Sequence, residues 1–326
     1  MRRALSTGFV LAGIDFFDEL ASGLPAAGAP ELRADLEATV TGITVAVFTL
    51  PLLVSLFVDT PVLFWAERRG RSRMIALGLF GMGAALILAG CAGTVPAFGA
   101  AFALFAVSSG LACSLAQAAL MDGDPARREQ NMTAWAFSGT LGDLCAPLCI
   151  AAAVALAGSH RAAYFAVGVG LVCLSPWFAR RELPSGAPLP EDDDEPARGA
   201  LRSALSNRAL LLWLAGVSLC GLLDEIFAAF GALWLRERFP RDPAVVATAL
   251  TACTLGALIG LALLHRLLAR HSPQLLLAIA CTGSIVAHFG WLASRSSLAA
   301  TLWMGVAGLF VAWHYPLAQA QAYRAA

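Results

Sequence analysis

The sequence predicts an all-α, polytopic membrane protein with about ten transmembrane helices. Hydrophobic residues make up 59% of its 326 residues and charged residues only 13%, whereas a soluble domain averages about 25% charged residues. The mean hydropathy is +0.72. A spanning helix needs roughly 20 mainly apolar residues, and we predict ten such spans, at residues 5–24, 39–64, 74–93, 95–120, 133–157, 161–179, 208–235, 244–266, 273–293 and 297–320.

One long polar segment divides these spans. Residues 180–207 contain four prolines and the acidic run Glu191–Glu195. A segment of this composition has no apolar face to bury and is typical of a solvated linker. We therefore predict an N-terminal bundle of six helices over residues 1–179, a cytoplasmic linker over residues 180–207, and a C-terminal bundle of four helices over residues 208–326.

The arginines indicate how the chain crosses the membrane. With the N-terminus inside, 16 of the 22 basic residues fall on the cytoplasmic side and 6 outside. Because basic loops stay cytoplasmic, we predict that both termini and the linker are cytoplasmic, as in a bacterial inner-membrane protein. The start of the chain resembles a signal peptide, but Asp15, Asp18 and Glu19 interrupt its apolar run. We interpret it as a retained helix.

The composition gives no support to several classes of function. The formal net charge is zero, so there is no reason to expect nucleic acid as a partner. No CxxC pair, HExxH pattern or nucleophile–base constellation occurs in the spans. We therefore predict no metal, no cofactor and no enzymatic activity. The cysteines all fall in apolar segments and are interpreted as small buried residues: Cys91, Cys113, Cys145, Cys149, Cys173, Cys220, Cys253 and Cys281.

Two short sequences recur at almost the same offset. Phe17-Asp18-Glu19-Leu20 in the first span returns as Leu223-Asp224-Glu225-Ile226 in the seventh, 206 positions later. Leu115-Ala116-Gln117-Ala118 in the fourth span returns as Leu317-Ala318-Gln319-Ala320 in the tenth, 202 positions later. The two matches together predict parallel repeats, as in transporters built from two similar helical halves.

The loop between the second and third spans carries a recognisable motif. Residues 65–73 read WAERRGRSR, which resembles the signature G-x-L-A-D-R-x-G-R-[RK] of the major facilitator superfamily. Leu63 and Trp65 replace the first Gly and the Leu of that signature, and Glu67 stands for its Asp. The positions that match are Ala66, Arg68, Gly70 and Arg71. In the fifth span, residues 142–147 (GDLCAP) are similar to the G-x-x-x-G-P motif of the family's antiporters, with Ala146 for the second Gly.

This resemblance implies two helical bundles that move a small solute by alternating access. It also implies that the 65–73 loop latches the cytoplasmic side through ion pairs. Two features are expected to depart from the family pattern: the ten predicted spans leave out the family's last two helices, and no Arg stands upstream of Gly110 in the fourth span. The alternative interpretation of the loop is a basic inner loop that only follows the positive-inside rule.

The first span contains a cluster of acidic residues. Asp15, Asp18 and Glu19 stand at i, i+3 and i+4, so all three lie on one face of one helix. A carboxylate at the bilayer centre costs about 2.5–3.5 kcal/mol. Three on one face therefore predict a wet cavity and a group that carries protons, because like charges this close disfavour the ionisation of all three. The alternative is a short span with Asp18 and Glu19 at its outer interface.

The remaining candidates are polar residues within other spans, and each has helix packing or a wet helix end as its alternative. For contact with substrate or coupling protons we predict Asp15, Asp18, Glu19, Asp143, Asp224, Glu225, Gln117 and Gln319. For a cytoplasmic gate we predict Asp59, Glu67, Arg68, Gly70 and Arg71. Asp59 precedes Pro61 near the cytoplasmic end of the second span, which suits a hinge or a solvated end.

Together these features favour a secondary active transporter, a permease for a small solute, coupled to protons. The 142–147 motif favours export by antiport. An acid-lined cavity suits a cationic or neutral solute, although coupling protons explain the acids equally well. The alternatives are a non-transporting sensor, an inactive truncated product and, with less support, a membrane-embedded enzyme. The expected partners are the solute, protons and the lipid bilayer.

Overall fold

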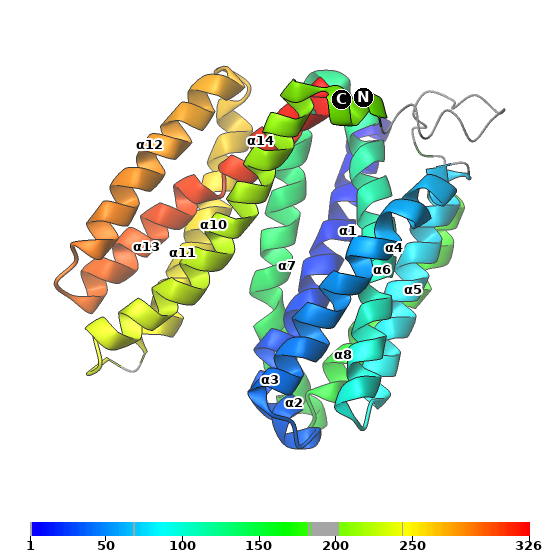
Figure 1. Ribbon diagram of the computed structural model, residues 1–326, viewed down its shortest axis with the longest axis horizontal. Helices are drawn as coiled ribbons and strands as arrows, with labels where there is room; N and C mark the ends of the chain where they lie inside the picture. Colours follow the sequence, from blue (N-terminus) through cyan, green and yellow to red (C-terminus); the bar gives the residue numbers. More distant parts are fainter. Residues whose placement is uncertain (1, 68, 182, 184–201, 243) are drawn as a thin grey trace. The chain divides into compact units, whose positions relative to one another are not determined.

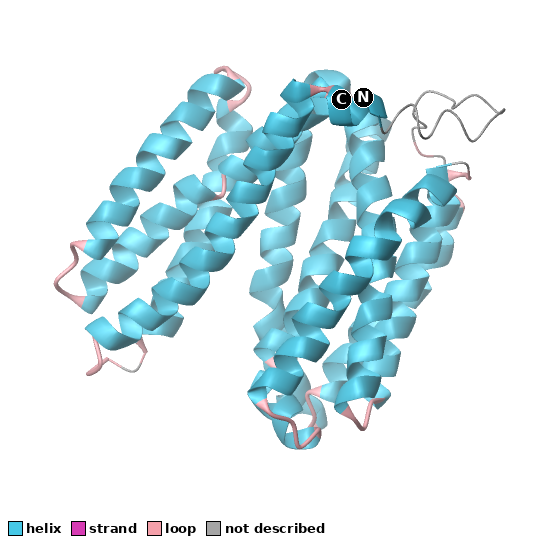
Figure 2. Ribbon diagram, in the orientation of Figure 1, coloured by secondary structure: helices cyan, strands magenta, loops and turns pink. Residues whose placement is uncertain are grey.

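The computed structural model describes residues 2–67, 69–181, 183, 202–242 and 244–326, with backbone alone for residues 2–7, 67 and 222–229. The described part is helical with short connecting loops and has no strand (Figure 2). The all-α fold predicted from the sequence is thus confirmed. The predicted linker over residues 180–207 lies mostly outside the described residues.

The chain forms two compact units. The first unit consists of Met1–Gly123 and Leu141–Glu191, and the second of Asp124–Thr140 and Asp192–Ala326. The helices are drawn in Figure 1; those of the first unit are α1 (Arg2–Ala27), α2 (Ala29–Asp35), α3 (Val40–Thr44), the π-helical η1 (Val45–Thr49), α4 (Leu50–Glu67), α5 (Arg71–Cys91), α6 (Val95–Gly123) and α8 (Arg161–Ala179).

Helix α7 (Arg128–Ala157) is continuous, but it starts in the second unit and ends in the first. The short η2 (Pro125–Arg127) precedes it. Further helices of the second unit are α10 (Arg208–Arg238), α11 (Val245–Leu267), α12 (Pro273–Leu292), α13 (Ser297–Val311) and α14 (His314–Ala325). The predicted tenth span therefore corresponds to two helices, α13 and α14, which meet at Ala312 and Trp313.

Polar side chains fix where several helices begin. Asn207 accepts a hydrogen bond from the backbone N–H of Leu210 at 3.1 Å, at the start of α10. Ser272 and Ser296 cap α12 and α13 in the same way. Each cap satisfies an N–H that has no partner in the first turn of a helix. The sequence therefore sets the helix starts locally.

In the first unit, small residues let the helices approach closely. A Cβ added to Gly168 of α8 would lie 2.8 Å from the carbonyl oxygen of Gly83 in α5. A Cβ on Gly78 of α5 would lie 2.8 Å from the Cβ of Ala112 in α6. Without a strong hydrophobic drive between helices in lipid, such close packing holds a bundle together.

At one end of the first unit, Arg161 ties three elements together. It donates to the Asp35 carboxylate of α2 at 3.0 Å and to the carbonyl oxygens of Gly90 and Ala92 at 2.8 and 2.7 Å. The carbonyls are the last ones of α5, which otherwise have no partner. His160, beside it in the chain, is 4% exposed. This network lies between the spans rather than within them.

In the second unit, α11 and α13 make the closest contact. A Cβ on Gly256 or Gly260 would meet the carbonyl oxygens of Gly305 and Leu309, respectively. The indole N–H of Trp313 donates to the carbonyl of Gly260 at 2.8 Å. Glycine is required at both positions of this G-x-x-x-G pair because any side chain would strike backbone.

The two units pair their helices in the same pattern. In the first unit α6 contacts α1, α4 and α5; in the second unit α13 contacts α11 and α12, and α14 contacts α10. If α1 corresponds to α10, and α6 to α13 with α14, the two patterns coincide. This is the correspondence that the two recurring sequences predict.

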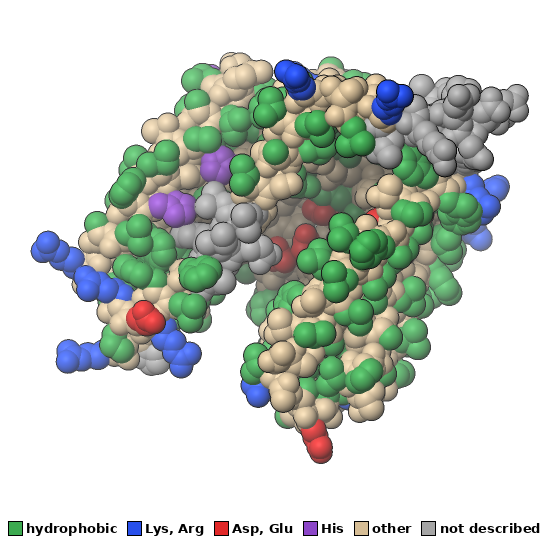
Figure 3. Space-filling model, in the orientation of Figure 1, with side chains coloured by type: hydrophobic (Ala, Val, Ile, Leu, Met, Phe, Trp, Pro, Cys, Tyr) green, Lys and Arg blue, Asp and Glu red, His purple; other side chains and the backbone are tan. Residues whose placement is uncertain are grey.

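The outer surfaces suit lipid. Large apolar side chains remain exposed along the helices, among them Phe57 at 73%, Leu212 at 74% and Phe289 at 70%. Figure 3 shows the apolar side chains spread over the visible face. Eight stretches of the described chain are long and apolar enough to cross a membrane. Neither α1, with its three acids, nor α10 is among those eight, so the predicted count of ten is not established.

Candidate functional site

The three acidic residues of α1 lie together. One carboxylate oxygen from each residue lies within 4.8 Å of one carboxylate oxygen of each of the other two. Asp15 is 8% exposed, and Asp18 and Glu19 are half-buried. Two like charges at this separation repel by about 3.5 kcal/mol at an effective dielectric constant of 20. A triply ionised cluster is therefore disfavoured, and a bound proton or cation would stabilise it.

Helix α6 presents polar groups to this cluster. The side chains of Ser109 and Cys113 hydrogen-bond to the Asp18 carboxyl group. Gln117, one turn further along α6, is 9% exposed. These residues stand at i, i+4 and i+8, so they form one polar stripe on one face of α6. The structure thus brings together Asp18 and Ser109, which are far apart in the sequence.

Asp59 of α4 lies against the same part of α6. Its carboxylate oxygens are 2.9 and 3.1 Å from the position that a Cβ on Gly110 would occupy. Asp59 is half-buried and hydrogen-bonds to Ser55 within its own helix. Gly110 neighbours Ser109, so Asp59 lies level with the acidic cluster rather than with the 65–73 loop.

The 142–147 motif positions α1 against α7. A Cβ on Gly142 would strike the carbonyl oxygen of Phe16, and a Cβ on Gly23 would lie 2.8 Å from the Cβ of Ala146. Gly142 and Ala146 are therefore the small residues that allow this contact. Asp143, the acid within the motif, is exposed on α7.

The 65–73 loop holds part of the predicted gate. Arg71 forms an ion pair with Asp122 at the end of α6, with 2.6 Å between the nitrogen and the oxygen. Gly70 precedes the first residue of α5 and has open space around it. The side chain of Glu67 and the whole of Arg68 lie outside the described residues. Arg71 is thus paired within the first unit.

The second unit is described only in part at the predicted site. The backbone of Asp224 and Glu225 is helical in α10, but their side chains lie outside the described residues. Gln319 is half-buried on α14.

A charged network that we did not predict lies in the second unit. Glu129, in the first turn of α7, is 4% exposed. It accepts hydrogen bonds from Gln321 at 3.0 Å and from Arg324 at 2.9 Å. Arg128 donates to the carbonyl of Tyr323 at 3.0 Å. The signal for this network in the sequence is weak, since Glu129 falls just before the predicted fifth span.

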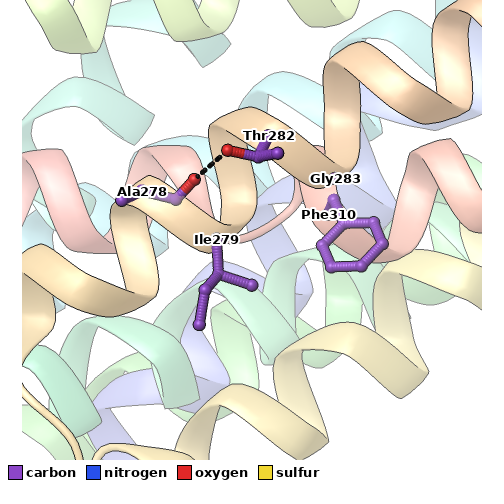
Figure 4. Close-up of a pocket in the computed structure, with 5 residues that line it drawn as sticks. All are labelled: Ala278, Ile279, Thr282, Gly283 and Phe310. Carbon is purple, nitrogen blue, oxygen red and sulfur yellow. Dashed lines mark hydrogen bonds between the residues drawn. The ribbon is translucent and has the colours of Figure 1, made fainter.

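A groove on the second unit has a different character. It has a volume of about 360 Å³ and is lined by Ala278, Ile279, Thr282, Gly283 and Phe310 (Figure 4). The hydroxyl of Thr282 donates to the carbonyl of Ala278 at 2.9 Å and so is already used within α12. The groove therefore offers an apolar surface and little to recognise a polar solute.

Comparisons with known proteins agree on the fold. The family model described as Major Facilitator Superfamily matches residues 11–326. Similar solved structures include FucP, a transporter of this superfamily in an outward conformation, with a TM-score of 0.69, 14% identity, and coverage of 97% of this chain and 86% of that one. Another is the Escherichia coli fucose:proton symporter FucP (N162A), with a TM-score of 0.70, 14% identity, and coverage of 98% and 87%.

A third similar structure is a bacterial homologue of the human lysosomal transporter Spinster, inward-facing and unoccupied. Its TM-score is 0.56, with 17% identity and coverage of 99% of this chain and 74% of that one. A comparison with curated protein sequences found no match. Because the family model covers nearly the whole chain, the chain belongs to the major facilitator superfamily and is a multi-pass membrane transporter of that fold.

Proposed function

We propose that the protein is a secondary transporter that couples movement of a small solute to protons bound by the acidic cluster of α1. The observation that carries this proposal is the approach of Asp15, Asp18 and Glu19 to within 4.8 Å of one another. Their mutual repulsion makes at least one of them a proton acceptor whose occupancy changes with its surroundings. A buried group that exchanges a proton is what coupling requires.

Ser109 and Cys113 would hold the Asp18 carboxyl group in place as its charge changes. A hydroxyl group can donate to a carboxylate and can accept from a protonated carboxyl group. The polar stripe of α6 therefore stabilises both states of Asp18. Gln117, further along this stripe, is proposed to contact the solute, because an amide donates and accepts hydrogen bonds.

The second half of the coupling site is proposed at Asp224, Glu225 and Gln319. Asp224 and Glu225 repeat the acidic pair of α1, and Gln319 repeats Gln117. A central site in a repeat-built transporter uses equivalent positions of both halves. Asp143 on α7 and Asp59 on α4 are proposed as further acidic groups around the solute path.

The network around Glu129 is proposed to act as a gate on the cytoplasmic side. Helix α7 belongs to the second unit up to Thr140 and to the first unit from Leu141 onward, and its first turn is bound to Arg324 and Gln321 within the second unit. Movement of the units against each other during alternating access would have to break this attachment or bend α7. Arg71 and Gly70 in the 65–73 loop are proposed as a second part of the gate, with Glu67 and Arg68.

The orientation is proposed from the arginines, with both termini and the linker cytoplasmic in a bacterial inner membrane. Single cysteines at Ser185 in the linker and at Arg295, between α12 and α13, test it in a chain cleared of native cysteines. We expect a membrane-impermeant reagent, applied to intact cells, to label Arg295→Cys and to leave Ser185→Cys unmodified. The reverse pattern would overturn the orientation.

The solute is proposed to be small and either neutral or cationic, because three carboxyl groups converge in the described site. The experiment that tests the function begins with thermal shifts of the purified protein against panels of neutral polyols, cationic amines and carboxylates. A ligand that binds the native state raises the melting temperature by mass action. Proton-dependent uptake of the stabilising solute into proteoliposomes supports the proposal, and binding without any uptake contradicts it.

A further inference from the structure

Two exposed tryptophans at helix ends of the first unit each carry a stacked arginine. The guanidinium carbon of Arg69 lies 3.9 Å from the ring centroid of Trp65, at the end of α4. The guanidinium carbon of Arg181 lies 4.0 Å from the ring centroid of Trp177, at the end of α8. All four side chains are exposed. Among the described residues, no carboxylate forms an ion pair with either arginine.

The packing of α5 against α8 brings these two stacks to the same end of the first unit. The contact of Gly83 with Gly168 and that of Gly90 with the Phe165 ring show that α5 and α8 run antiparallel. The exposed Arg73 precedes Gly83 by ten residues, and Trp177 follows Gly168 by nine residues. The start of α5 thus lies beside the end of α8, and a short loop joins it to the end of α4.

We call Trp65, Arg69, Arg73, Trp177 and Arg181 the arginine–tryptophan rim. Figure 3 shows basic side chains in blue at this edge of the first unit. An apolar strip follows the rim along the outer faces of α5 and α8. On α5 it contains Leu77 and Phe80, which are 47% and 50% exposed, and on α8 it contains Val169, which is 51% exposed.

We propose that the arginine–tryptophan rim binds an anionic phospholipid, with the phosphate on the guanidinium groups and the acyl chains along the apolar strip. A guanidinium group matches a phosphate with two parallel hydrogen bonds. Stacking on tryptophan fixes the guanidinium plane and leaves its N–H edges open to a ligand. Tryptophan itself favours the membrane–water interface.

The apolar strip decides between a lipid and a soluble anion as the occupant. A soluble phosphate ester would use the guanidinium groups alone, whereas a phospholipid covers both the rim and the exposed strip below it. In the orientation proposed above, on which this argument rests, this edge lies in the cytoplasmic leaflet, which is also the one rich in anionic lipids. The combination of stacked guanidinium groups and an adjoining apolar strip therefore favours a phospholipid.

Lipid titration of the full-length protein in detergent, followed by native mass spectrometry, tests this proposal. We expect phosphatidylglycerol to bind the double variant R69Q/R181Q about tenfold more weakly than the wild type. The matched control is R266Q/R270Q, which removes two exposed arginines that stack on no tryptophan among the described residues, and it should bind as the wild type does. Phosphatidylcholine should bind all three proteins equally, and glycerol phosphate should not displace phosphatidylglycerol.

Equal losses in R69Q/R181Q and R266Q/R270Q would overturn the proposal in favour of general charge attraction. Displacement by glycerol phosphate would identify a soluble anion as the occupant, and that result also overturns it. If R69Q/R181Q is not recovered folded, R69K/R181K keeps the charge and loses the planar contact. We expect that variant to bind phosphatidylglycerol at least threefold more weakly, and unchanged binding would contradict the role of the stacks.

Discussion

Arg324 of α14 donates to the carboxylate of Glu129 in α7, with 2.8 Å between nitrogen and oxygen. The Glu129 side chain is 5% exposed and that of Arg324 is 43% exposed. Gln321 binds the same carboxylate. The buried member of the pair is thus the acid, so loss of its partner leaves a charge that water cannot reach.

The two partners should respond differently to neutralisation. We expect Arg324→Gln to lower stability more than Glu129→Gln, by about 1–3 kcal/mol, because it leaves a buried charge without its partner. The double variant should recover part of this loss, since it removes both charges. Melting temperatures in detergent check the order. Equal effects of both single variants, with no recovery in the double variant, would contradict it.

The same pair tests the proposed gate. If the Glu129 network closes the cytoplasmic side, Glu129→Gln should increase the labelling of a cysteine placed at Gln117 by a cytoplasmic reagent. Glu237→Gln is the control with the same change of charge, because Glu237 is exposed on α10 and forms no ion pair among the described residues. Labelling that is the same in both variants would contradict a gating role.

The contact of α1 with α7 should depend on Gly142. A Cβ at this position meets the backbone of Phe16 and Leu20, so we expect Gly142→Ala to destabilise the protein. Gly170 has open space around it, and Gly170→Ala should be neutral or stabilising by up to about 1 kcal/mol through helix propensity. Thermal melting of both variants measures the difference. An equal or higher melting temperature for Gly142→Ala would contradict the close contact.

Acidification should destabilise the first unit through protonation of His160. Burial lowers the pKa of His160, against the opposing charge of Asp35, whose oxygen lies 3.7 Å from the imidazole. The unfolded chain, with a histidine pKa of about 6.5, therefore binds a proton at a higher pH than the folded protein. The contribution of the neutral, buried His160 to the free energy of unfolding is therefore fully present above that pKa and falls as the pH drops below it.

Replacement of His160 should reduce this acid sensitivity. We expect His160→Gln to lose less melting temperature than the wild type between pH 7.5 and pH 5.5. His271→Gln is the control, because His271 is exposed. If His160→Gln and His271→Gln follow the wild-type curve equally, burial of His160 does not contribute to the acid response.

The helices could be predicted from the sequence because their signals are local. Continuous apolar windows set the spans, and capping residues such as Asn207 and Ser272 set their starts. The acidic cluster could also be predicted from local sequence, because the spacing of Asp15, Asp18 and Glu19 places them on a common face of one helix.

Contacts between distant helices could not be predicted in this way. Nothing in the sequence links Asp18 to Ser109, or Asp59 to Gly110, because these pairs depend on how α1, α4 and α6 pack. Glu129 was missed for the same reason, since its partner Arg324 lies 195 positions away. The two recurring sequences predict parallel repeats, and under that correspondence the helix contacts within the two units follow the same pattern.

Proton movement through the acidic cluster of α1 is the central claim. Its most direct measurement is the internal pH of proteoliposomes when a solute found by thermal shift is added outside. We expect the wild type to change the internal pH. In the first half, either Asp18→Asn or Glu19→Gln should abolish this change, and in the second half either Asp224→Asn or Glu225→Gln should do so. The variant that abolishes it identifies the coupling residue of that half. Exchange of labelled solute at equal pH should continue in those variants, because exchange needs no net release of protons. Full proton movement in all four variants, with normal solute transport, would contradict the claim.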